Sequence, residues 1–146
     1  MLKLLFIGLF PFFNVISNWE TNFDVAKEKA VKENKIMLVH FYKNDKKGSA
    51  NHFQTALFEN DTFVSYANKH LILLQVDLSI KTNNDTEQQF IYNSIILERY
   101  NPKGIYPYTV ILESSGKLLT SWEHSRQLSS SKLVADIQSS IEANKQ

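Results

Sequence analysis

The sequence predicts an α/β fold, a three-layer sandwich in which a mixed four- or five-stranded sheet is flanked by helices. Two continuous apolar runs, at 36–42 and 71–78, have the composition of strands that are buried on both faces. Segments of helical periodicity surround these runs, and a turn with a glycine at 113–117 precedes an edge strand. The chain of 146 residues is long enough for one domain with a substantial core.

The predicted domain begins with a helix that precedes the first apolar run. Thr21 or Asn22 can cap this helix, which is expected to run from Phe23 to about Glu33. Its apolar stripe is formed by Phe23, Ala26, Ala30 and Val31. We expect Trp19, just before the cap, to pack under the helix as a hydrophobic staple.

Two helices are predicted between the apolar runs. The polar segment 43–48 ends in Gly48, and Ser49 can cap a central helix on which Phe53, Ala56 and Leu57 recur at helical spacing. Residues 59–61 interrupt this pattern and begin a shorter helix that ends at about residue 69. The apolar positions of the shorter helix are Phe63, Tyr66 and Ala67.

The second half of the chain is predicted to alternate helix, hairpin and helix. Asp85 or Thr86 can cap a helix that Asn101 and Pro102 end, after a polar loop at 79–86. The expected apolar side of this helix consists of Phe90, Ile91, Ile95, Leu97 and Tyr100. An apolar strand up to residue 112, the hairpin turn and an edge strand at 118–122 follow. Residues 129–131 can cap the final helix, with a stripe of Leu133, Val134, Ile137 and Ile141.

Several of these stretches resemble the thioredoxin-like proteins, in particular a branch of exported bacterial proteins. A Trp before the first helix, an aromatic at the end of the first long strand, and a Phe–Phe–Tyr spacing met by residues 58, 63 and 66 belong to the resemblance. The stretch from Gly104 to Thr109 is similar to the family's Gly-aromatic-Pro-Thr motif. The resemblance implies a thioredoxin-like fold and a cis peptide bond between Tyr106 and Pro107.

The same resemblance places Lys47, Gly48, Ser49 and Ala50 at the redox motif, so that Lys47 and Ala50 occupy the positions of its two cysteines. The sequence contains no cysteine. Disulfide exchange requires a thiolate that attacks a disulfide sulfur, so these residues cannot carry out the family's chemistry. We therefore expect a protein that is inactive in redox chemistry and has no catalytic residue.

The first 17 residues differ in composition from the predicted domain at 18–146. Lys3 is followed by an apolar stretch from 4 to 13, and residues 15–17 are small or branched. This pattern is typical of a signal peptide cleaved before Asn18, whereas Pro11 and Asn14 interrupt the roughly 20 apolar residues that a membrane anchor needs. We expect a periplasmic or secreted protein without a stable membrane anchor.

Other candidate sites are weaker. Lys43, Lys46 and Lys47 precede the predicted central helix, whose start could hold an anion, although a solvated basic loop is the preferred interpretation. None of the four histidines has the spacing of a metal site. His40 is expected in the core or at an edge of the sheet, and His52, on the first turn of the predicted central helix, is the one histidine kept as a possible site residue. No cofactor is indicated.

The near balance of 16 basic and 15 acidic residues gives no reason to expect nucleic acid binding. Asn60 and Asn84 begin acceptor patterns for N-glycosylation, relevant only in a eukaryotic secretory pathway.

Two functions remain open from the sequence. In the first, the protein binds a polypeptide partner in a groove formed by Lys47, Gly48, Ser49, Ala50, Tyr106, Pro107 and Tyr108, since peptide pairing beside the proline needs no cysteine. In the second, the protein belongs to a disulfide-exchange system by descent only. The sequence leaves the partner and the oligomeric state undetermined.

Overall fold

The computed structural model describes residues 18–43, 56–79, 84–123 and 128–145. In these residues a five-stranded sheet has the order β1-β3-β2-β4-β5. The strands are β1 (Trp19–Glu20), β2 (Ile36–Tyr42), β3 (Leu71–Asp77), β4 (Tyr108–Leu112) and β5 (Leu118–Glu123). β1, β3 and β2 are parallel, and β4 is antiparallel to both of its neighbours. The mixed sheet predicted from the sequence is confirmed.

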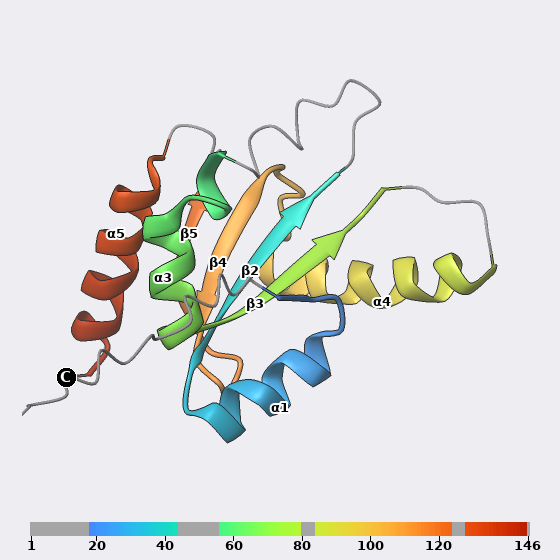
Figure 1. Cartoon of the computed structure of the whole chain (residues 1–146). Helices are drawn as coiled ribbons and strands as arrows, with labels where there is room; N and C mark the ends of the chain where they lie inside the picture. Colours follow the sequence, from blue (N-terminus) through green and yellow to red (C-terminus); the bar gives the residue numbers. More distant parts are fainter. Residues whose placement is uncertain (1–17, 44–55, 80–83, 124–127, 146) are drawn as a thin grey trace, which may run out of the picture.

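Helices cover both faces of the sheet, which makes the predicted three layers (Figure 1). They are α1 (Phe23–Glu33), α3 (Asp61–His70), α4 (Asn84–Tyr100) and α5 (Ser130–Ala143), and residues 56–58 are also helical. The apolar side chains of α1 and α4 pack on one face of the sheet, and those of α3 and α5 on the other. β2 lies between β3 and β4 and contributes alternate residues to both cores.

Capping side chains explain why α1, α3 and α5 begin where they do. Asn22, Asn60 and Ser129 each accept hydrogen bonds from backbone N–H groups two or three residues further on, at distances of 2.9 to 3.2 Å. Helix α1 ends at Asn34, whose φ of 51° is left-handed, a conformation that asparagine adopts more readily than most residues. These local signals fix α1 at the predicted bounds.

The structure corrects the expectation for Trp19. Trp19 lies in β1 and pairs with Leu73 of β3, and its ring contacts Phe58 edge-on with 5.1 Å between ring centroids. It therefore packs in the core on the α3 and α5 side of the sheet, instead of under α1. A strand of two residues is too short to show an alternating pattern in the sequence. Its partner strand also lies more than fifty residues away, so no local signal indicates the pairing.

The predicted apolar stripes of α1 and α4 are partly wrong. On α1, Val31 is 62% exposed, because it lies about 100° around the helix from the buried row of Phe23, Ala26 and Ala30. On α4, the buried row consists of Asn93, Ile96 and Tyr100, whereas Phe90, Ile91 and Ile95 are exposed. Helix α4 also begins at Asn84, slightly before its predicted caps. An exposed apolar surface on α4 results.

Candidate functional site

The predicted site residues that the structure describes lie in the segment joining α4 to β4. The Tyr106–Pro107 peptide bond is cis, Pro107 is buried, and Tyr106 and Tyr108 are half-buried. Lys43, which follows β2, brings its Nζ atom to 4.5 Å from the centroid of the Tyr106 ring. Residues 47–50, with Lys46, His52 and the predicted start of the central helix, lie outside the described residues.

Asn101 holds this segment in place. Its side-chain amide donates to the backbone carbonyl oxygen of Ile105 at 2.8 Å, and its Oδ1 atom accepts from the N–H of Ile105 at 3.2 Å. The backbone carbonyl oxygen of Asn101 also accepts from Gly104, whose φ of 62° suits a residue without a side chain. Asn101 is 1% exposed, and its two bonds to Ile105 are partly buried. The backbone leading into Tyr106 is therefore fixed from the end of α4.

Within the described residues, the backbone of Tyr106 has no hydrogen-bond partner. The ladder between β2 and β4 ends at the pair of Phe41 and Tyr108, two residues beyond Tyr106. No described residue donates to the carbonyl oxygen of Tyr106 or accepts from its N–H. A backbone segment next to a sheet whose donor and acceptor are not used by that sheet can pair with an extended peptide.

A groove of about 430 Å³ adjoins Tyr106. It lies where the ends of β2 and β3 meet one side of α4. Its lining residues are Lys43, Leu78, Ser79, Phe90, Ser94, Leu97 and Tyr106. The volume is within the range of about 300 to 1,000 Å³ that is usual for ligand sites. Among the described residues that line the groove, Lys43 is the one that carries a charge.

Sequence reasoning misses most of this groove. The apolar pattern predicts Phe90 and Leu97 in the core, as it does Leu78 at the end of the run 71–78, and it does not single out Ser79 or Ser94. Phe90, Ser94 and Leu97 are spaced i, i+4 and i+7, so they share one side of α4. The excess of apolar positions on this helix is the available signal, because one helix cannot bury them all against one sheet.

His40 is a core residue, as expected. It is 1% exposed, and its Nδ1 atom lies 3.0 Å from the hydroxyl of Thr109. Burial lowers the pKa of His40 to about 4, so the ring is neutral at pH 7. The described residues contain no group of three or more His, Asp or Glu side chains that could hold a metal ion.

Burial raises the pKa of Tyr106, and a second tyrosine at this end of the sheet is also perturbed. Burial, together with the charge of Asp77 and a hydrogen bond to it, raises the pKa of Tyr42 to about 12. Tyr42 therefore keeps its proton at any physiological pH and is not a candidate for acid–base chemistry near pH 7. The described part of the site thus offers shape, backbone hydrogen bonds and one lysine, and no activated nucleophile.

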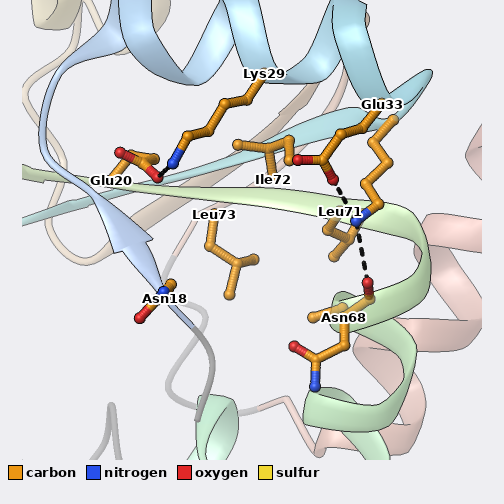
Figure 2. Close-up of a pocket in the computed structure, with 10 residues that line it drawn as sticks. Asn18, Glu20, Lys29, Glu33, Asn68, Leu71, Ile72 and Leu73 are labelled. Carbon is orange, nitrogen blue, oxygen red and sulfur yellow. Dashed lines mark hydrogen bonds and ion pairs between the residues drawn. The ribbon is translucent and has the colours of Figure 1, made fainter. Parts of the chain in front are cut away.

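A second hollow, of about 310 Å³, lies at the opposite end of the sheet beside β1 (Figure 2). Its charged side chains are already paired: Lys29 with Glu20, and Lys35 with Glu33 at 2.7 Å. Lys35 also donates to the backbone carbonyl oxygen of Asn68 at 3.1 Å. The hydrogen bond from Lys35 lowers the pKa of the Glu33 carboxyl. With its charges satisfied internally, this hollow is a weaker candidate than the groove beside Tyr106.

None of the helices in the described residues has both the length and the hydropathy of a membrane-spanning segment.

No protein-family model matches the sequence. No curated protein matches it either.

Solved structures of similar shape establish the fold. The DsbH oxidoreductase has a TM-score of 0.76 and 20% identity, over 96% of this chain and 94% of its own. A thioredoxin from Thermus thermophilus has a TM-score of 0.59 and 13% identity, over 85% and 87% of the two chains. A disulphide isomerase from Xylella fastidiosa Temecula1 has a TM-score of 0.57 and 16% identity, over 84% and 99%. The protein has a thioredoxin-like fold, as the resemblance in its sequence implied.

Proposed function

We propose that this thioredoxin-like protein is a non-catalytic module that binds an extended segment of a polypeptide partner beside Tyr106 and Pro107. The observation that carries the proposal is the open backbone of Tyr106, on a segment already fixed by Asn101. The absence of cysteine from the sequence excludes disulfide exchange but leaves this mode of binding intact.

Backbone pairing at Tyr106 would supply affinity that depends little on the partner's sequence. Each hydrogen bond of this kind contributes about 0.5 to 1.5 kcal/mol. The half-buried rings of Tyr106 and Tyr108 add apolar surface on both sides of Pro107. Residues 47–50 would complete the groove if the resemblance to the redox motif holds.

The experiment selects peptides from a random twelve-residue library against the purified protein and then methylates each backbone nitrogen of a selected peptide in turn. Methylation removes one donor at a time. We expect about a tenfold loss of affinity at the position that pairs with Tyr106, and little change at most others. Failure to select any peptide, or equal affinity for every methylated peptide, would refute the proposal.

A control on the protein uses two half-buried tyrosines. Tyr106→Ala removes the ring beside the open backbone and is expected to weaken binding severalfold. Tyr66→Ala removes a ring of the same size from α3, on the other face of the sheet, and should leave binding unchanged. Fluorescence anisotropy measures both, and circular dichroism checks that both variants fold.

A second candidate is that the protein descends from a thiol–disulfide oxidoreductase system and retains no activity. The similarity in fold to the DsbH oxidoreductase favours this descent. An insulin-reduction assay with dithiothreitol separates activity from ancestry. We expect no turnover above a heat-denatured control, and turnover above it would contradict both candidates.

We also propose that residues 1–17 are an export signal and that the protein acts in the periplasm or outside the cell. The proposal rests on Lys3 and the apolar stretch that follows it. Expression in a Gram-negative host, followed by fractionation and intact-mass measurement, tests it. A mass that begins at Asn18 in the periplasmic fraction is expected, whereas an unprocessed protein in the cytoplasm would overturn it.

A further inference from the structure

The groove beside Tyr106 combines apolar walls with one positive charge. Leu78, which is buried, lines it together with Phe90 and Leu97 of α4 and with Tyr106. The ammonium of Lys43 lies over that ring, 4.5 Å from its centroid. Within the described residues, Lys43 makes no ion pair, and none of those that line the groove carries a carboxylate.

The groove and the open backbone share a residue. The ring of Tyr106 is a wall of the groove, whereas its N–H and carbonyl oxygen have no partner among the described residues of the sheet. In a bound peptide that paired with Tyr106, alternate side chains would point to the same face. One of these side chains could therefore enter the groove while the peptide backbone remains paired. The exposed Phe90, Ile91 and Ile95 extend the apolar surface beyond the groove along α4.

We propose that the groove selects peptides in which a large apolar residue lies close to a carboxylate. The apolar residue packs between Phe90, Leu97 and Tyr106, and the carboxylate pairs with Lys43. This inference rests on the proposed function and adds the chemical class of the partner. The charge complement and the continuity with Tyr106 both favour an acidic, apolar peptide over a basic one.

Ser94 fits the same partner. Its hydroxyl donates to the backbone carbonyl oxygen of Phe90 at 2.8 Å, which leaves its lone pairs as acceptors within the groove. A small residue at position 94 also keeps the groove open, because a larger one would project between Phe90 and Leu97. Position 94 can therefore be used to fill the groove without changing Lys43 or Tyr106.

The first test changes the charge. Peptides selected from the random library by the wild-type protein should be enriched in Asp and Glu near an apolar residue. Lys43→Gln is expected to weaken such a peptide about threefold and Lys43→Glu about tenfold, and Lys43→Glu should favour a counterpart with Lys in place of the acidic residue. Lys32→Glu, on the exposed part of α1, makes the same change in net charge and should have no effect.

The second test fills the groove. Ser94→Phe should weaken binding about tenfold or more, whereas Ser139→Phe should not. Ser139 is the matched control, because it lies exposed on α5 and also donates to a backbone carbonyl oxygen four residues earlier. Thermal unfolding of both variants verifies that each is folded.

The outcomes separate the two proposals. If selected peptides bind and respond to methylation, but show no acidic preference and ignore both Lys43→Glu and Ser94→Phe, the inference about the groove is wrong and the proposed function stands. If no peptide binds, both are wrong. Saturable binding of decanoate without any peptide binding would assign the groove to a small apolar anion instead. Dimerisation in sedimentation that Ser94→Phe abolishes would assign it to a second copy of the protein.

Discussion

Stability should fall in mild acid because of His40. Burial lowers the pKa of His40 from the usual value near 6.5 to about 4, so the folded protein resists a proton that the unfolded protein accepts. The contribution of the neutral His40 ring to the free energy of unfolding is fully present above pH 6.5 and is lost as pH falls toward 4. With a pKa of 6.5 in the unfolded protein and about 4 in the folded protein, the free energy of unfolding falls by about 2 kcal/mol between pH 7 and pH 5.

His40→Phe removes the titrating ring. The position suits an aromatic replacement, because Phe58 and Tyr42 surround it with ring centroids 4.9 and 6.1 Å away. The variant loses the contact with the Thr109 hydroxyl at every pH, so only the pH-dependent part of the comparison reports on the proton.

Urea unfolding at pH 7, 6 and 5 measures the effect. The free energy of unfolding of the wild type should fall by about 2 kcal/mol more than that of His40→Phe over this range. His70→Phe, at an exposed position on α3, should retain the wild-type pH dependence. If His40→Phe and the wild type lose stability in parallel, the assignment to His40 is refuted.

Substitutions at four other described positions test the binding segment and the core. Asn101→Ala should weaken peptide binding severalfold by releasing Ile105, whereas Asn22→Ala, which costs α1 about 1 kcal/mol through its cap, should leave affinity unchanged in the same anisotropy assay. Gly116→Ala should lower stability by about 1 to 2 kcal/mol in urea unfolding, because φ is 90° and the added carbon would lie 3.1 Å from the Tyr100 hydroxyl. Phe58→Ala should cost about 3 to 5 kcal/mol, and a loss below about 1 kcal/mol would contradict its place in the core.

Local signals allow much of the fold to be predicted. Helix α1 and strand β2 match their predicted bounds, because the cap at Asn22, the left-handed Asn34 and the apolar run of β2 are encoded within a few residues. The thioredoxin-like arrangement also follows from the resemblance, and the structure bears it out. In contrast, β1 depends on pairing with a distant strand and has no local pattern.

The orientation of α4 is not predictable from apolar spacing alone. Asn93 occupies the buried side because its amide donates to the backbone carbonyl oxygen of Asp77 at 2.8 Å, and a hydrophobic pattern assigns such a residue to solvent. This rotation exposes Ile91 and Ile95 and turns Phe90 toward the groove. The groove joins the ends of β2 and β3 to α4, so only the tertiary arrangement reveals it.

The structure describes one half of the groove that the resemblance predicted and not the other half. Tyr106 and Pro107 lie together with Lys43 at one end of the sheet. The contribution of Lys47, Gly48, Ser49 and Ala50 stays a prediction, because these residues lie outside the described part of the protein.

The two bonds between Asn101 and Ile105 have a consequence for the kinetics of recognition. Because these bonds already hold the backbone that leads into Tyr106, an incoming peptide need not wait for that segment to order, and most of the freedom lost on docking is the ligand's. Differences among ligands should then arise mainly in how long each remains bound, rather than in how fast each arrives.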